Sequence, residues 1–216
     1  RTQRLDVLSR VLRHNLRTEA QVLLGHADRI QRSDDLAAAR AGAERVEASA
    51  ESLTALNEKV GEVYWAMEFD AADAAPTSVE PALEAVADEY RDRADVTVDC
   101  ACPTGTSVLA GDRLDRAVGY LVADALVDND ADPEVTLAAE AVNDGVEVSV
   151  TSPGGRITDE ERELLEGDAD ITQLNHSRTI DLWVAQWIAD AYGGEFHIAE
   201  DAPGSRVALR LPRADA

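Results

Sequence analysis

The chain has 216 residues, and 43 acidic against 20 basic side chains give it a net charge of −23. Nucleic-acid binding is excluded, because the phosphate backbone would repel so negative a protein. A disordered acidic chain is excluded as well, because 45% of the residues are hydrophobic and recur with clear periodicity. No run of about 18 apolar residues occurs, so we expect no membrane span and a cytoplasmic protein.

The basic residues are almost all arginine, and Lys59 is the single lysine. An acidic surface poor in lysine fits a protein that stays soluble in concentrated salt, where charge repulsion is screened over a few Å. We therefore predict a halophilic protein. At this length the chain can form two small domains, each with its own core.

The first 32 residues have the pattern of one long amphipathic helix. Its apolar face is made by Leu5, Leu8, Leu12, Leu16, Ala20, Leu23, Ala27 and Ile30, which recur three or four positions apart. His14 lies about 200° round the helix from Leu12 and from Leu16, so it points to solvent or to a partner. A phosphoryl group on a free imidazole nitrogen would lie near the cations Arg10, Arg13 and Arg17. A plain surface histidine is the alternative.

The stretch around His14 resembles the phosphoacceptor box of histidine kinases in two-component systems, in the His-Asn-Leu-Arg form common among haloarchaeal members. The resemblance implies that His14 carries a phosphoryl group and that Arg13 and Arg17 help by charge. Asn15 stands where bacterial members place an acid, and an amide cannot accept a proton at neutral pH. Thr18 stands where kinase relatives keep a residue that positions water to dephosphorylate a receiver domain. An exposed helix residue is the alternative for Thr18.

A second long helix is predicted after a turn and N-cap at residues 33–35. Its apolar and small residues follow a heptad rhythm: Leu36, Ala39, Ala43, Val46, Ala50, Leu53, Val60 and Met67. Each helix would be about 48 Å long, and a hairpin of two such helices would leave a seam uncovered. We therefore predict a homodimeric four-helix bundle over residues 1–70, the dimerisation and phosphoacceptor architecture of histidine kinases.

A linker with Pro76 is predicted over residues 71–78, followed by mixed helices and strands over residues 79–213. Helices are predicted at 79–93, 112–128, 159–165 and 179–192, and strands at 96–100, 107–109, 134–141, 146–150, 195–199 and 206–211. Helices over one mostly antiparallel sheet make an α+β sandwich. The order and spacing resemble the ATP-binding domain of histidine kinases, the GHKL or Bergerat fold.

Two of the family's nucleotide-binding positions have changed. Asp124 stands at the Asn that helps to hold Mg²⁺, and a carboxylate can also ligate magnesium. Asp128 and Asp130 follow closely, so we expect all three to form a solvated acidic helix end. Ser152 stands at the acid that reads the adenine amino group, and its hydroxyl carries no charge.

The third motif has lost the glycines that let main-chain amides close on the phosphates. Ser177, Thr179 and Asp181 occupy those positions, and Asp181 adds a negative charge where the phosphates would lie. The resemblance therefore implies a degenerate ATPase-like domain. We predict that it binds no Mg·ATP and that the protein has no other cofactor.

These observations predict a histidine phosphotransferase that relays phosphoryl groups between His14 and the aspartates of receiver domains in response regulators. A non-catalytic pseudokinase that regulates partners by binding, and a histidine kinase with an altered ATP site, stay open as alternatives. A phosphatase activity on the receiver through Thr18 is open as well. Cys100 and Cys102 lack a second ligand pair, so no metal site is predicted.

Overall fold

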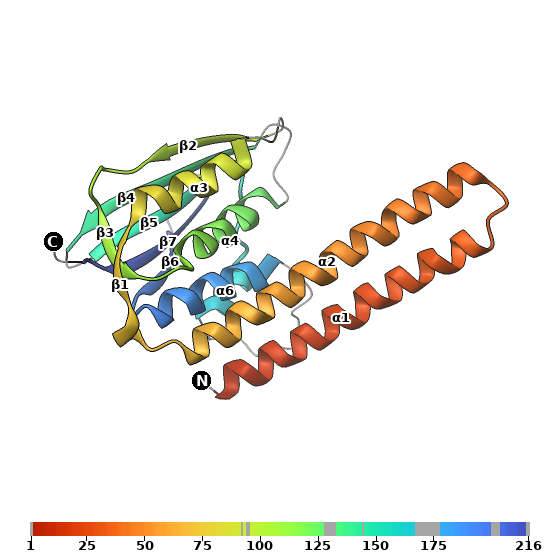
Figure 1. The fold of residues 1–216 in the computed structure, drawn as a ribbon, viewed down its shortest axis with the longest axis horizontal. Coiled ribbons are helices and arrows are strands. Elements are labelled where there is room, and N and C mark those ends of the chain that lie inside the picture. Colours follow the sequence, from red (N-terminus) through yellow and green to blue (C-terminus); the bar gives the residue numbers. More distant parts are fainter. Residues whose placement is uncertain are drawn as a thin grey trace. The chain divides into compact units, whose positions relative to one another are not determined.

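The computed structural model describes residues 2–91, 93, 96–127, 133–143, 145–166, 178–199 and 204–214. They form two compact units that divide between Gly61 and Glu62. The first unit contains a helical hairpin, and the second is an α/β sandwich (Figure 1). The mixed α+β fold class predicted from the sequence is confirmed.

The hairpin consists of α1 (Thr2–Gln31) and α2 (Leu36–Glu68), which have nearly the predicted bounds. Asp35 caps α2, because its carboxylate accepts a hydrogen bond of 3.0 Å from the main-chain N–H of Ala37. A side chain at Gly42 would collide with the side chain of Ile30. The two helices therefore approach closely at this point, and a larger residue would require the Ile30 side chain to move.

The hairpin covers only part of the predicted apolar faces. Leu23 and Ile30 of α1 are half-buried, whereas Leu16 remains 41% exposed. On α2, Leu36 is 66% exposed, and the small residues Ala43 and Ala50 are exposed as well. One hairpin alone therefore leaves apolar surface uncovered.

The second unit contains four helices and seven strands among the described residues. The helices are α3 (Val79–Arg91), α4 (Leu114–Leu126), α5 (Asp159–Glu166) and α6 (Arg178–Ala191). The strands are β1 (Ala75–Ser78), β2 (Thr97–Ala101), β3 (Ser107–Ala110), β4 (Glu134–Val142), β5 (Gly145–Ser152), β6 (Glu195–Ile198) and β7 (Ser205–Pro212). Every predicted helix and strand of this region is present, with small changes at the ends.

Five of these strands form one sheet in the order β2-β4-β5-β7-β6. β2 runs parallel to β4, and the other neighbours are antiparallel. In β4, Val135, Leu137 and Ala139 are buried while Glu134 and Thr136 are exposed, so helices cover one face of the sheet. Figure 1 shows α3 and α4 lying against that face.

The predicted linker at residues 71–78 contains regular structure. A 3₁₀ turn covers Ala71–Asp73, and β1 pairs with β3 in a separate two-stranded sheet, with Pro76 opposite Leu109. Proline cannot donate to a strand ladder, but a two-stranded sheet has open edges that tolerate it. The segment is therefore partly built into the α/β unit.

Backbone geometry explains two of the turns. Asn143, between β4 and β5, has a φ of +41°, which asparagine tolerates better than most residues. Gly193 has a φ of +73° directly after α6, and the N–H of Gly194 donates to the carbonyl of Ala189. A glycine of this kind ends a helix without steric cost.

The last two turns of α2 belong to the α/β unit, together with the segment that follows them. Trp65 and Phe69 pack with Tyr192, which follows α6: the ring centroids of Trp65 and Phe69 lie 5.6 and 5.3 Å from that of Tyr192. Both contacts are edge-on, an arrangement that aromatic pairs favour.

Among the described residues, none of the helices is both long and apolar enough to span a bilayer.

Candidate functional site

The first candidate site is the stretch of α1 around His14, which the sequence predicts to be a phosphoacceptor. His14 lies within this helix, but the side chains of His14 and Asn15 lie outside the described residues. Helical spacing places residues 14, 17 and 18 on one face, because positions three and four apart are neighbours. Arg17 and Thr18 are exposed there, and Arg13 is exposed too. A solvent-borne partner can therefore reach the cationic side chains that the sequence predicts as helpers.

The prediction of a solvated acidic helix end is wrong for Asp124. Its side chain is only 1% exposed, in the last turn of α4. The reason is visible in the helical spacing, because Asp124 follows Leu121 by three positions and Leu121 is fully buried. Asp128 and Asp130 lie outside the described residues. Asp124 thus places a carboxyl group inside the domain, in the helix that the sequence predicts to carry the first nucleotide motif.

Ser152, which the sequence predicts to stand in the place of an adenine-reading acid, is fully buried at the end of β5. Its hydroxyl donates a hydrogen bond of 3.0 Å to the main-chain carbonyl of Glu134 on β4. Its register partner on β7 is Ser205, which is 5% exposed. Two neutral hydroxyl side chains therefore lie buried on adjacent strands at this point of the sheet.

Two glycines close the space around this serine pair. Gly155 donates its N–H to the carbonyl of Ser152 at 3.1 Å, and a Cβ on Gly155 would collide with the Ser205 hydroxyl. Gly204 has a φ of +82°, and a Cβ there would collide with the carbonyl of Ser152. The chain is thus packed against itself at this point too closely for an added methyl group. Sequence reasoning missed Gly204 and Ser205, although a glycine directly before a strand was the available signal.

The third motif is only partly described. Ser177 and the side chain of Thr179 lie outside the described residues, whereas Asp181 is 7% exposed in the first turn of α6. A carboxylate near a helix N-terminus interacts favourably with the helix dipole and competes with any other anion for that place. The pKa of the Tyr90 hydroxyl is raised, and burial is the largest cause. The charges of Glu89 and Asp181 raise it further, whereas the charge of Arg93 lowers it. The negative charge of Asp181 therefore acts inside this domain.

The described residues offer no metal-binding group. No cluster of three or more His, Cys, Asp or Glu side chains occurs within the described ranges. Cys100 and Cys102 are free, and burial raises the pKa of both thiols, to about 11 for Cys100. Because the thiolate is the form that binds metal and attacks disulfides, a raised pKa disfavours both reactions at neutral pH.

The fold is that of histidine kinases. AdeS, a histidine kinase of Acinetobacter baumannii, is similar with a TM-score of 0.70 and 17% identity, over 94% of this chain and 98% of that chain. The ATP binding domain of PrrB from Mycobacterium tuberculosis has a TM-score of 0.53 at 23% identity, over 66% of this chain and 99% of that domain. A bacterial phosphotransferase covers 95% of this chain and 94% of its own, with a TM-score of 0.55 and 12% identity. The sequence matches no protein-family model and no curated protein.

Proposed function

We propose that the protein is a histidine phosphotransferase of a two-component system. His14 accepts a phosphoryl group from the aspartate of one receiver domain and returns it to the aspartate of another. In the first step the bond from phosphorus to the aspartate oxygen of the donor breaks as the bond to the imidazole nitrogen forms. In the second step the bond from phosphorus to the imidazole nitrogen breaks as a bond to the aspartate oxygen of the second receiver forms. The α/β unit binds no nucleotide. It acts as a scaffold or as a docking surface for the response regulator.

The packing around Ser152 is the main support for the proposal that the protein does not bind ATP. An adenine-binding position must present a group to the ligand, whereas Ser152 is fully buried and hydrogen-bonded to Glu134. When ionised, the buried carboxyl groups of Asp124 and Asp181 would oppose a polyphosphate, because like charges in a low-dielectric interior repel strongly. These features support a degenerate nucleotide site and favour phosphotransfer over the kinase alternative.

The hairpin supports the part of the proposal that concerns assembly. Apolar side chains on both helices remain uncovered in one chain, among them Leu16, Leu24 and Leu36. A second copy packed across a two-fold axis would cover them in a four-helix bundle. We therefore propose a homodimer whose two His14 side chains serve response regulators. The acidic, arginine-rich composition further supports a halophilic protein.

Solved structures include proteins of both proposed kinds. AdeS is described as a histidine kinase, and another protein of similar fold is described as a bacterial phosphotransferase. The same two-part architecture therefore serves either activity, and the choice depends on the residues at the nucleotide positions. In this chain those residues favour the phosphotransferase.

The test is to ask which phosphoryl donor labels the protein. Wild-type protein is incubated separately with γ-labelled ATP and Mg²⁺, and with a labelled, phosphorylated receiver domain. We expect label from the receiver only, and none after His14→Gln. His26→Gln is the matched control, because His26 lies on the same helix and should leave labelling intact.

The alternatives give different results. Labelling from ATP would make the protein a kinase with an altered nucleotide site. Loss of label from the receiver without labelled protein would indicate a phosphatase, and Thr18→Ala would then abolish it. Binding of the receiver without transfer, equal in wild type and His14→Gln, would establish the pseudokinase.

A further inference from the structure

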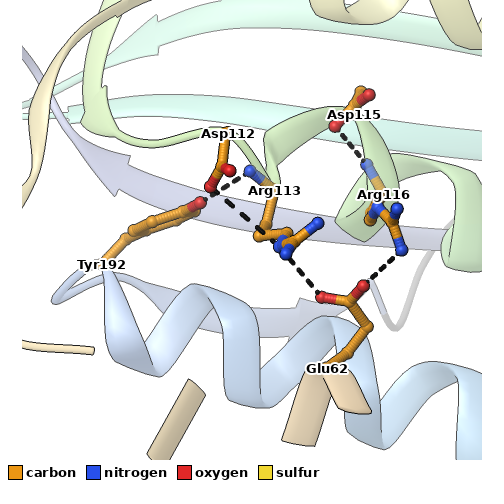
Figure 2. A network of polar contacts seen from close by, with 6 residues as sticks. All are labelled: Glu62, Asp112, Arg113, Asp115, Arg116 and Tyr192. Carbon is orange, nitrogen blue, oxygen red and sulfur yellow. Dashed lines mark hydrogen bonds and ion pairs between the residues drawn. The ribbon is translucent and has the colours of Figure 1, made fainter. Parts of the chain in front are cut away.

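Glu62 places a buried carboxylate at the point where the two compact units divide. It lies in α2 and its side chain is 4% exposed. Its two oxygens face different arginines: Oε1 accepts a hydrogen bond from Arg116 at 2.5 Å, and Oε2 lies 3.3 Å from Nε of Arg113. Figure 2 shows the carboxylate held between the two guanidinium groups. A buried carboxylate needs such partners, because an unpaired charge is costly away from water.

Arg113 joins three helices at this point. It directly precedes α4, and its main-chain N–H donates a hydrogen bond of 3.0 Å to the hydroxyl of Tyr192 beyond α6 (Figure 2). Its guanidinium carbon lies 5.7 Å from the ring centroid of Trp65 on α2. Glu62, Trp65 and Phe69 therefore attach the last two turns of α2 to the α/β unit.

Gly61 directly precedes this attached segment. It lies inside α2, and no atom comes within 4 Å of where its Cβ would be. No close packing therefore demands a glycine here, unlike at Gly42. Within a helix, glycine is less favourable than alanine because its backbone has more freedom in other conformations. A residue of low helix propensity, with no packing that requires it, thus stands between the attached segment and the hairpin.

We infer that Gly61 is a hinge and that residues 62–69 move with the α/β unit. The ion pairs of Glu62 fix this segment, so bending occurs within α2 and not in the residues that follow it. Movements of the hairpin then reach the α/β unit through Glu62, Arg113 and Arg116. The inference rests on the packing around Glu62 and holds whichever phosphoryl donor the protein uses.

Spin-label distances test the hinge in the full chain. Cys100 and Cys102 are replaced by serine, and labels are placed at exposed positions on helices. The pair Met67→Cys and Ala85→Cys lies within the α/β unit, whereas the pair Ala48→Cys and Ala85→Cys spans Gly61. Labelled protein is mixed with excess unlabelled protein, so that each dimer contributes one labelled chain. We expect a narrow distance distribution for the first pair and a broad one for the second.

Gly61→Ala should narrow the broad distribution and leave the narrow one unchanged. Gly25→Ala is the matched control, because Gly25 also lies in a helix with nothing within 4 Å of its Cβ position. It should alter neither distribution. Glu62→Gln should broaden the distribution between positions 67 and 85, since the segment loses its ion pairs. Should this variant fail to fold, Arg116→Gln removes one ion pair at a side chain that is 48% exposed.

Three outcomes would overturn the inference. The first is a distribution across Gly61 that is already narrow in the wild type. The second is an equal response of that distribution to Gly61→Ala and Gly25→Ala. The third is an unchanged distribution between positions 67 and 85 in both Glu62→Gln and Arg116→Gln, which would mean that the ion pairs do not fix the segment.

Discussion

The Ser152 hydroxyl donates a hydrogen bond to the carbonyl of Glu134, and this contact joins the end of β5 to the start of β4. The residue that the sequence predicts to stand in the place of an adenine-reading acid is thus part of the sheet's own hydrogen bonding. A side chain that is fully buried and engaged in this way is a structural residue. Changing it should affect stability before it affects any ligand.

We expect Ser152→Asp to destabilise the protein by about 1–3 kcal/mol, because it sets a buried carboxylate against a carbonyl oxygen. Ser152→Ala should cost about 0.5–1.5 kcal/mol through the lost hydrogen bond. Neither variant nor the wild type should bind Mg·ATP measurably. Denaturant unfolding and titration calorimetry provide the two measurements. Thr136→Asp, at an exposed position of β4, is the control, and micromolar ATP binding by wild type would contradict the degenerate site.

Tyr192 should make the protein sensitive to alkali. Burial raises the pKa of its hydroxyl to about 12, while the hydrogen bond from the Arg113 N–H opposes the rise. The folded state therefore holds the hydroxyl proton of Tyr192 more tightly than the unfolded state, in which a tyrosine has a pKa of about 10. The resulting stability is complete below about pH 10 and is lost as pH rises toward about 12.

Tyr192→Phe should cost about 1–3 kcal/mol at neutral pH, because the buried N–H of Arg113 loses its acceptor. The same variant should lose less stability than wild type between pH 9 and pH 11.5. Urea unfolding across this range measures both effects. Tyr64→Phe is the matched control, because Tyr64 is 63% exposed. Equal alkaline losses in wild type and Tyr192→Phe would show that another group is responsible.

Much of the architecture could be predicted because local signals determine it. The Asp35 cap, the Asn143 turn and the glycine after α6 act through neighbouring residues, and each was visible in the sequence. The histidine-kinase fold followed from the order of the elements and is confirmed. The homodimer, the halophilic origin and the role of His14 remain predictions.

Some features could not be predicted because they are contacts between distant parts of the chain. Glu62 meets Arg113 and Arg116 more than 50 residues later, and no local pattern pairs them. Ser152 meets Ser205 only because β5 and β7 are neighbours in the sheet. The Asp124 side chain was predicted to be exposed because its neighbours are acidic. Its helical spacing with the buried Leu121 indicated instead that it lies in the interior. Strand β1 was missed because Pro76 is unfavourable in most strands.

Ala50→Arg should dissociate the proposed dimer. Ala50 is exposed in one chain and continues the row of Leu36 and Ala43 at seven-residue intervals along α2. A charged side chain would be buried in the seam between two hairpins, at a cost of several kcal/mol. Ala48→Arg is the matched control, because Ala48 is exposed about 200° away round the same helix. Light scattering at molar salt measures the mass, and a folded wild-type monomer would contradict the dimer.

Arg17 should assist phosphotransfer at His14 by its charge. It lies three residues beyond His14, on the same face of α1, and is exposed to the partner. A phosphoryl group carries about two negative charges, so Arg17→Gln removes an exposed attraction. An exposed charge pair is worth about 0.2–1 kcal/mol, which predicts a roughly 1.5- to 5-fold slower transfer. The fold should be unaffected.

The dependence on pH separates this role from simple docking. Attack requires a neutral imidazole, so the rate should fall as pH drops through about 6.5. A nearby cation disfavours protonation of a histidine, and Arg17→Gln should therefore move the midpoint of this fall to higher pH. Single-turnover transfer from a phosphorylated receiver, measured from pH 5.5 to pH 8.5, provides the profile. Arg29→Gln, exposed farther along α1, should leave both rate and midpoint unchanged. If Arg17→Gln weakens receiver binding without moving the midpoint, Arg17 serves docking and does not act on His14.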